Sequence, residues 1–141
     1  MGRTIEKDVW YPHPPTRVWM ALTDRDALAR WLMPNDFEPR VGCEFTMRTP
    51  PAPGFDGVVR CEVLEMDEPR TMSWRWRGGG IDTVVRFELA AERQGTRLRL
   101  VHSGFEGVRG WMVSGILGKG WGKMLEGRLR EEVGRVARAS G

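Results

Sequence analysis

Few residues in this sequence are suited to catalysis, and His102 is the foremost of them. His102 shares one face of a predicted strand with Leu98 and Leu100. An imidazole inside an apolar cavity can act as a base or as a hydrogen-bond donor. No acidic residue within a few positions on that face offers an orienting partner, since Glu62 and Glu88 lie on outward or unassigned faces. We therefore favour a histidine satisfied by a backbone or water partner, and no catalytic dyad is predicted.

Metal and phosphate chemistry are also disfavoured by the spacing of the candidate residues. The histidines and the cysteines Cys43 and Cys61 follow no metal-ligand spacing, and His13 lies between prolines in a predicted loop. A phosphate-binding loop needs Ser or Thr after its lysine, whereas glycine follows Lys119 and methionine follows Lys123. We predict no catalytic residue, no metal site and no cofactor.

A nucleic-acid site is the next alternative, because tryptophans and arginines alternate over residues 74–77. Bases could stack between such residues on an open sheet. Strand alternation, however, places Trp74 and Trp76 on one face and Arg75 and Arg77 on the other. The net charge of +3 comes from residues 119–138, which contain six basic and three acidic residues. We interpret this excess as a solvated helix face and predict no nucleic-acid partner.

The element that must position any site is a long helix at the C-terminal end. Its apolar residues recur every three or four positions, at Leu117, Trp121, Leu125, Leu129, Val133 and Val136. This spacing predicts one buried helix face. Glycines at 115, 118, 120 and 122 each cost a helix about 1 kcal/mol relative to alanine. The firm part of the helix is therefore expected from Gly120, and its start between residues 107 and 120 stays open.

Upstream, the pattern alternates like a sheet, with two short helices after the first strand. Pro15 can begin the first short helix, Asp24 can cap the second, and Pro34 ends it. Strands are predicted at 4–11, 42–49, 58–66, 71–77, 83–89 and 96–103. Both faces of segment 58–66 are half apolar, so its orientation is not assigned. The order predicts an α+β fold in which about six antiparallel strands wrap the long helix.

Length and composition favour one globular domain spanning residues 1–141. Hydrophobic residues make up 40% and charged residues 29% of the chain, as in soluble proteins. No apolar run approaches the roughly 18 residues that span a bilayer, so no membrane insertion is expected. The N-terminus carries no apolar signal region, and a reduced cysteine pair is expected. We predict a cytoplasmic protein.

The inward faces together predict a concave apolar interior between the sheet and the helix. The residues expected to line a ligand site there are Tyr11, Trp31, Phe45, Trp74, Trp76, Phe87, Leu100, His102, Trp121 and Leu125. Apolar walls with a few polar groups are typical of small-molecule sites. The same set would also describe a core that is simply full.

The order of elements resembles the helix-grip fold of the START-like (SRPBCC) superfamily. Several stretches are more specifically similar to its branch related to the activator of heat-shock-protein-90 ATPase. They are residues 14–19, 28–31, Gly57 with 63–65, 96–100, 102–105 and 120–125. The resemblance covers nearly the whole chain, but the glycine-rich approach to the last helix departs from the usual pattern.

The resemblance implies a function that the residues alone do not give. Proteins of this fold commonly hold lipids, sterols or polyketides, and the cochaperone-related branch contacts a chaperone. We predict non-catalytic binding of a hydrophobic small molecule, with Tyr11 and His102 orienting its polar end. Two alternatives stay open. One is a protein-interaction module that uses the outer arginines and the basic helix face. The other is a cyclase- or hydrolase-type enzyme with His102 as its acid–base residue.

Overall fold

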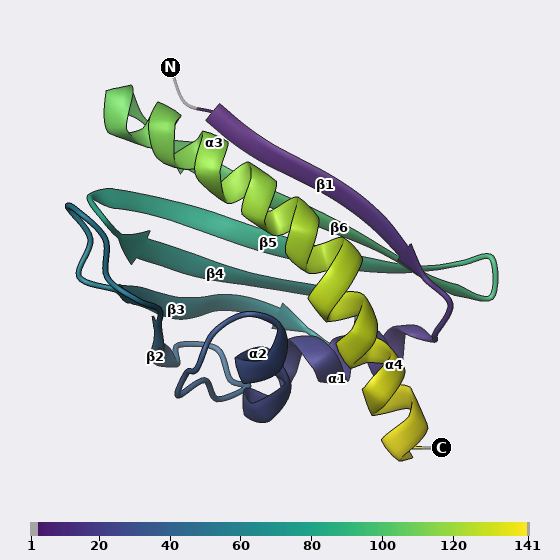
Figure 1. Ribbon diagram of the computed structural model, residues 1–141. Coiled ribbons are helices and arrows are strands. Elements are labelled where there is room, and N and C mark those ends of the chain that lie inside the picture. Colours follow the sequence, from purple (N-terminus) through teal and green to yellow (C-terminus); the bar gives the residue numbers. More distant parts are fainter. Residues whose placement is uncertain (1–2, 141) are drawn as a thin grey trace.

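The computed structural model describes residues 3–140 and contains the predicted succession of elements (Figure 1). The elements are β1 (Arg3–Tyr11), α1 (Pro15–Thr23), α2 (Arg25–Trp31), β2 (Glu44–Arg48), β3 (Val58–Asp67), β4 (Thr71–Gly78), β5 (Ile81–Glu92), β6 (Gly95–Phe105), α3 (Gly107–Lys123), η1 (Met124–Arg128) and α4 (Leu129–Ser140). The strands form one antiparallel sheet in the order β1-β6-β5-β4-β3-β2. The predicted α+β helix-grip arrangement is confirmed.

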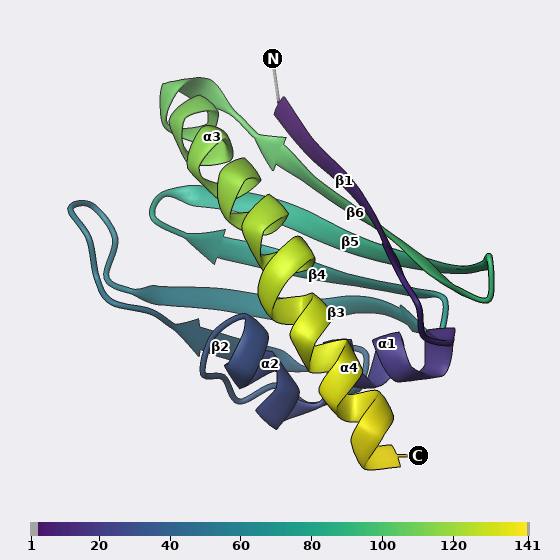
Figure 2. The same ribbon diagram turned by 45° about the vertical axis from the view of Figure 1, so that its right-hand side comes forward.

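The two short helices begin where the sequence signals predicted, and α2 ends at Trp31, before Pro34. Pro15 occupies the first position of α1, where its missing N–H removes no hydrogen bond. The Asp24 carboxylate accepts a hydrogen bond from the Ala27 N–H at 2.9 Å and caps α2. Both helices lie at one end of the sheet beside α4 (Figure 2). They close that end of the interior.

The sheet buries one face and exposes the other, as the alternation predicted. On β4, Trp74 and Trp76 are buried, whereas Arg75 forms an ion pair with Asp82 on the outer face. The structure also orients β3, which the pattern left unassigned, because the side chain of Val63 points inward together with those of its neighbours two and four residues earlier. The apolar core therefore lies between the concave face and the C-terminal helix.

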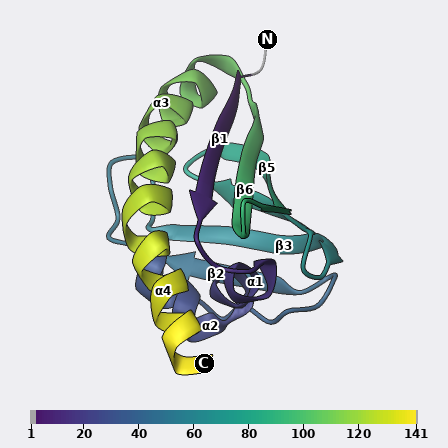
Figure 3. The same ribbon diagram turned by 90° about the vertical axis from the view of Figure 1, so that its right-hand side faces the viewer.

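The C-terminal helix crosses the concave face diagonally and is continuous from Gly107 to Ser140 (Figures 1 and 3). It thus begins well before the firm segment expected from Gly120. Packing against β1 and β6 holds this earlier part, with Val113 and Leu117 partly buried against the core. The predicted buried stripe is confirmed from Trp121 onward, where its members are at most 5% exposed.

A single π-helical turn, η1, interrupts this helix and was not predicted. Its hydrogen bond runs from the Leu129 N–H to the Met124 carbonyl, five residues back. A tertiary hydrogen bond reaches the helix at this turn. The Tyr11 hydroxyl donates to the carbonyl of Leu125, which lies within η1, at 2.7 Å. Trp121, Leu125 and Leu129 all point inward through this turn.

Candidate functional site

All ten residues predicted to line a ligand site lie in the interior. Each is at most 3% exposed. They come from β1, α2, β2, β4, β5, β6, α3 and η1, so nearly every element contributes to one cluster between the sheet and the helix. The sequence therefore predicted the location of these side chains correctly. Their role in binding stays a prediction.

Trp74 is the centre of an aromatic group at the β2 side of this interior. Its ring centroid lies 5.0 Å from that of Phe87, 5.2 Å from that of Phe45 and 5.7 Å from that of Phe37. Phe37 was missing from the predicted set. It lies in the loop between α2 and β2, where no periodicity marks a residue as buried. The group forms an apolar wall of edge-to-face and tilted rings.

The indole N–H of Trp74 is buried inside this wall without a hydrogen-bond acceptor. No residue that the structure describes accepts a hydrogen bond from it. The other buried tryptophans nearby differ, since Trp31 donates to the Ala21 carbonyl at 2.8 Å and Trp121 donates to His102. A buried donor without a partner costs about 1–3 kcal/mol. The Trp74 N–H is therefore a buried donor that the described residues leave unsatisfied.

His102 is held in a chain of hydrogen bonds at the β6 side of the interior. Trp121 Nε1 donates to His102 Nδ1 at 3.0 Å. Thr83 Oγ1 lies 2.8 Å from His102 Nε2 and donates its own proton to the Trp76 carbonyl at 2.9 Å. Because Thr83 then accepts from the ring, the network assigns the imidazole proton to Nε2.

This environment keeps His102 neutral. Burial lowers the pKa of the imidazole from 6.5 to about 3. Both ring nitrogens have partners, and neither partner is a carboxylate. A neutral, fully hydrogen-bonded imidazole is poorly placed to exchange protons with a substrate. The histidine is thus satisfied, as the favoured interpretation expected, but its partners are the side chains of Thr83 and Trp121 and not a backbone group or water.

Tyr11 is the second predicted polar group, and its hydroxyl is bound to the helix backbone. Burial raises the pKa of the phenol, so it stays protonated and donates to Leu125. The Arg130 guanidinium lies 5.1 Å from the centroid of its ring. The phenolic oxygen keeps acceptor capacity that a ligand donor could use.

The two cysteines, expected to be a reduced pair, are unpaired and both are buried. Burial raises the pKa of the Cys61 thiol to about 12. A thiol in that state is a weak nucleophile. No group of His, Cys, Asp and Glu within residues 3–140 is arranged to hold a metal ion.

Arg109 is an exposed residue near the start of α3 that contacts two loops of the sheet. Its Nη1 donates to the Gly79 carbonyl at 2.7 Å, which joins α3 to the β4–β5 turn. A Cβ built on Gly80 would lie 2.7 Å from Arg109 Cδ, and one on Gly54 would lie 3.3 Å from its Nη1. The loops that contain Gly54 and Gly80 thus pack closely around the Arg109 side chain.

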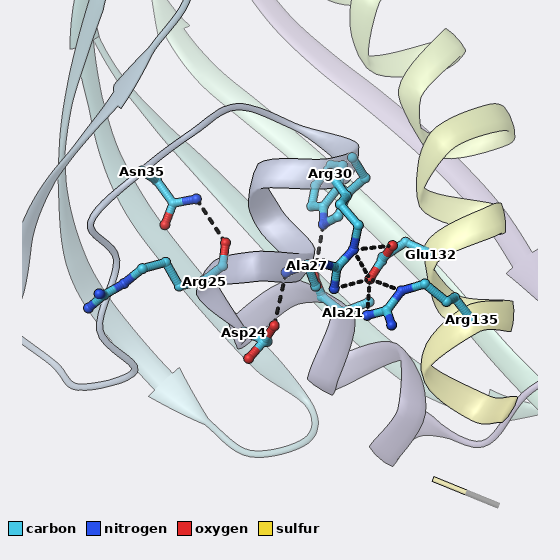
Figure 4. A network of polar contacts seen from close by, with 9 residues as sticks. Ala21, Asp24, Arg25, Ala27, Arg30, Asn35, Glu132 and Arg135 are labelled. Atoms are coloured by element: carbon cyan, nitrogen blue, oxygen red, sulfur yellow. Dashed lines mark hydrogen bonds and ion pairs between the residues drawn. The ribbon is translucent and has the colours of Figure 1, made fainter. Parts of the chain in front are cut away.

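A polar network joins α2 to α4 at the other end of the helix (Figure 4). The Glu132 side chain, 5% exposed, accepts hydrogen bonds from Arg30 and Arg135 at 2.8–3.0 Å. Burial opposes ionisation of this carboxyl. The hydrogen bonds from Arg135 and Arg30 outweigh that effect and hold the pKa of Glu132 below its usual value. The network clamps α4 to α2.

The clamp borders an open surface cleft of about 440 Å³. Its lining is charged and consists of Arg30, Arg128, Glu131, Glu132, Arg135 and Arg138. None of the predicted ligand-site residues lines it. Hydrophobic ligands prefer apolar walls, so this cleft does not suit them.

The curved sheet gripping one long helix over an aromatic interior defines the helix-grip class of START-like (SRPBCC) proteins. The profile of the family described as Activator of Hsp90 ATPase homolog 1-like protein matches residues 12–134, and the chain belongs to this family. A comparison with curated proteins gives no significant match. In the part of the chain that the structure describes, no helix is long and apolar enough to cross a membrane.

Solved structures support the same assignment. Protein MLL2253 from Mesorhizobium loti is 33% identical over 94% of this chain and 98% of its own, with a TM-score of 0.84. CalU16 from Micromonospora echinospora is 25% identical over 98% of this chain and 83% of its own, with a TM-score of 0.73. The Aha1 dimer from Colwellia psychrerythraea shares the fold at 20% identity, covering 87% of this chain and 90% of its own, with a TM-score of 0.73.

Proposed function

We propose that this protein binds a hydrophobic small molecule between the sheet and α3 and catalyses no reaction on it. The observation that carries the proposal is the Trp74 indole N–H, which is buried among aromatic rings without an acceptor. A ligand that brings an oxygen to this donor would satisfy it at the same time as it buries apolar surface.

The wall around Trp74 indicates the chemistry of the ligand. Phe45 and Phe87 offer ring faces and edges to an apolar or aromatic body. The unsatisfied Trp74 donor calls for one acceptor, such as a carbonyl or ether oxygen. A lipid-like or polyketide-like molecule with an oxygen near its buried end meets both requirements.

In this proposal Trp74 orients the polar end of the ligand, a role predicted for Tyr11 and His102. Tyr11 can still accept a hydrogen bond from a ligand, because its proton is directed to Leu125. His102 would have to release Trp121 or Thr83 before it could orient a ligand. Its low pKa and its occupied nitrogens support binding without catalysis.

Access to the interior requires movement, since its side chains are in contact with one another. The N-terminal part of α3 is the element best suited to move. Its glycines at 115 and 118 are not required by close packing, because a Cβ would meet nothing within 4 Å at Gly115 and only Ile5 Cγ1 at 3.9 Å at Gly118. These glycines weaken the helix without improving its contacts. Release of Arg109 from Gly79 would open the interior between α3 and the loops.

The test is an NMR titration that follows the indole N–H signals with a panel of fatty acids and aromatic polyketides. Saturable shifts are expected at Trp74 first, and at Trp76 and Trp121 next. Shifts confined to Trp10 and Trp111, which lie outside the interior, would contradict the proposal, as would the absence of saturable shifts from every compound.

A matched pair of variants tests the role of the Trp74 donor. Trp74→Phe keeps an aromatic ring and removes the N–H. It is expected to weaken the binding of a ligand that carries a carbonyl by roughly two- to tenfold. The affinity for the corresponding hydrocarbon is expected to change less. Trp10→Phe is the control, because the Trp10 N–H donates to the Glu92 carbonyl outside the interior. If Trp74→Phe weakens the binding of the carbonyl ligand and of the hydrocarbon equally, the Trp74 N–H does not donate a hydrogen bond to the ligand.

Family membership favours a second candidate, contact with a chaperone in the cytoplasm. The two unpaired cysteines are consistent with a reducing compartment. The outer arginines are already paired, as in Arg75 with Asp82 and Arg99 with Glu6, which reduces the free charge they offer to a partner. A pull-down whose partner is lost when Arg75 and Arg77 are changed to Glu would favour this candidate over the ligand site.

A further inference from the structure

The N-terminal part of α3 carries an exposed apolar face. Four large side chains that share one side of the helix point to solvent: Val108 is 78% exposed, Trp111 60%, Met112 57% and Ile116 71%. The opposite side of α3 holds the buried residues Gly110, Ser114 and Trp121. In Figure 3, α3 lies along the outer side of the molecule, with the strands on its other side. We call these four residues the α3 face.

Positive charge surrounds the α3 face. The Arg3 guanidinium lies 5.4 Å from the centroid of the Trp111 ring, and Arg109 borders the face on α3 itself. Lys119 and Lys123 are exposed and continue the same helical side toward η1. The sequence of α3 contains no acidic residue, and Glu106 at its N-cap is the neighbouring acid. The face is therefore apolar at its centre and cationic at its edges.

We propose that the α3 face docks on an anionic membrane surface, with Trp111, Met112 and Ile116 entering the region between headgroups and acyl chains. Amphipathic helices with an apolar stripe and basic flanks bind this way, and tryptophan favours that interface. Lys119 and Lys123 would lie at the level of the acidic headgroups, where each basic residue adds to the attraction. The proposal goes beyond the ligand site and does not depend on it.

Charge and size argue against a second copy of the chain as the occupant of this face. A two-fold dimer would place two α3 helices against each other, and their basic residues would repel because α3 itself holds no acidic residue. The face extends over nine residues, or about 13 Å of helix. A stable protein interface takes about 20–30 residues from each side. Membrane docking needs only a few inserted side chains.

The test is sedimentation of the full-length protein with sucrose-loaded vesicles. The protein is expected to pellet with vesicles of phosphatidylcholine and phosphatidylglycerol, and much less with phosphatidylcholine alone. Binding is expected to weaken as salt is added, because the flanking charges are exposed. Iodide is expected to quench Trp111 fluorescence less once anionic vesicles are present.

Variants distinguish vesicle binding through the α3 face from non-specific adsorption of exposed apolar residues. The double variant Trp111→Ser with Ile116→Ser is expected to lose about tenfold or more in vesicle affinity. Val41→Ser is the matched control, since Val41 is a 59% exposed apolar residue outside α3. Circular dichroism checks that each variant is folded.

Three results would overturn the proposal. Wild-type protein that does not pellet with anionic vesicles would do so, as would an α3 double variant that pellets as well as wild type. A dimer in analytical ultracentrifugation that the double variant dissociates would assign the face to a second copy. Neither binding to vesicles nor its absence changes what the NMR titration says about the interior. The vesicle experiment follows Trp111, whereas the titration follows Trp74, Trp76 and Trp121.

Discussion

The two halves of the C-terminal helix differ sharply although they are parts of one continuous element. α3 contains six glycines and exposes large apolar side chains at its beginning. α4 contains one glycine and buries Leu129 and Val133 completely. α4 also contacts both short helices and is clamped through Glu132, whereas α3 contacts mainly β1 and β6.

This difference shows how one continuous helix can be held firmly at α4 and still move at the start of α3. Tertiary packing, more than helix propensity, decides the stability of a helix in a protein. α4 has that packing on its inner face, and Trp121 extends it to the end of α3. Residues 107–118 have less of it, so we expect the helix to open from its N-terminal end.

The largest effect is expected where the two halves meet. Trp121→Ala removes a fully buried indole and leaves His102 Nδ1 without its donor. The free energy of unfolding is expected to fall by about 3–5 kcal/mol. Urea denaturation followed by circular dichroism measures this change.

Trp111→Ala makes the matched control, because the same substitution then falls on an exposed residue of α3. Its effect on stability is expected to stay within about 0.5 kcal/mol. An unchanged melting temperature for Trp121→Ala would count heavily against a helix gripped by the sheet.

The next effect concerns the pH dependence that His102 gives to the junction. The folded-state pKa of about 3 lies below the ordinary 6.5. Between pH 6.5 and pH 3, His102 therefore binds a proton in the unfolded chain but not in the folded chain. Stability is expected to be fully present above pH 6.5 and to fall as the pH drops toward 3. Urea unfolding between pH 7 and pH 4 measures this slope, and His102→Gln is expected to flatten it.

His13→Gln serves as the control, because His13 lies in the loop before α1 and outside the interior. It is expected to keep the wild-type slope. If His102→Gln keeps that slope as well, the acid sensitivity arises elsewhere.

A smaller effect is expected from breaking the clamp on α4. Glu132→Gln removes the charge that Arg30 and Arg135 share, and the loss is expected to be about 1–3 kcal/mol at pH 7. The two arginine side chains are each 44% exposed, so water replaces part of the interaction. Because the pKa of Glu132 is lowered in the folded state, this stabilisation exists above the ordinary value of 4.5 and disappears as the pH falls below it.

The comparison for this variant is Glu131→Gln at the exposed neighbouring position. Its effect is expected to stay within about 0.5 kcal/mol, measured by urea unfolding at pH 7 and pH 3. Equal losses for the two variants would mean that net charge, not the clamp, stabilises α4.

The smallest effect is a gain in α3. Gly115→Ala places a methyl group where nothing lies within 4 Å, and it is expected to raise stability by about 0.5–1 kcal/mol. Gly110→Ala is expected to do the opposite, since its Cβ would lie 2.8 Å from the Phe105 carbonyl carbon. Thermal unfolding of both variants decides the point. A loss of stability for Gly115→Ala would mean that the start of α3 is not an ordinary helix.

The sequence was informative where burial follows a period. Alternation placed Trp74, Trp76 and His102 inside, and the spacing of Trp121 and Leu125 gave the buried helix face. The glycines left the start of α3 open between residues 107 and 120. The structure places it at Gly107, because contacts with β1 and β6 hold a helix that propensity alone disfavours.

The remaining features depend on contacts between distant residues. Phe37 lies in a loop without periodicity, and its burial follows only from the position of Trp74. Nothing in the local sequence separates the unpartnered Trp74 N–H from the satisfied Trp31 N–H, because each depends on whether a distant acceptor lies within reach. The exposure of Trp111 likewise depends on which strands lie under α3.

The π-helical turn at Met124–Arg128 has a consequence for chain length. A turn with a hydrogen bond to the fifth residue accommodates one residue more than an α-helical turn. Removing one residue from η1, for example the exposed Gly127, would restore an ordinary turn and leave Leu129 and Val133 facing inward. The same deletion inside α4 would rotate everything beyond it by about 100° and expose the buried stripe. The helix therefore has one place where a single-residue deletion is expected to be tolerated, and it lies at the boundary between the segment that opens and the segment that stays anchored.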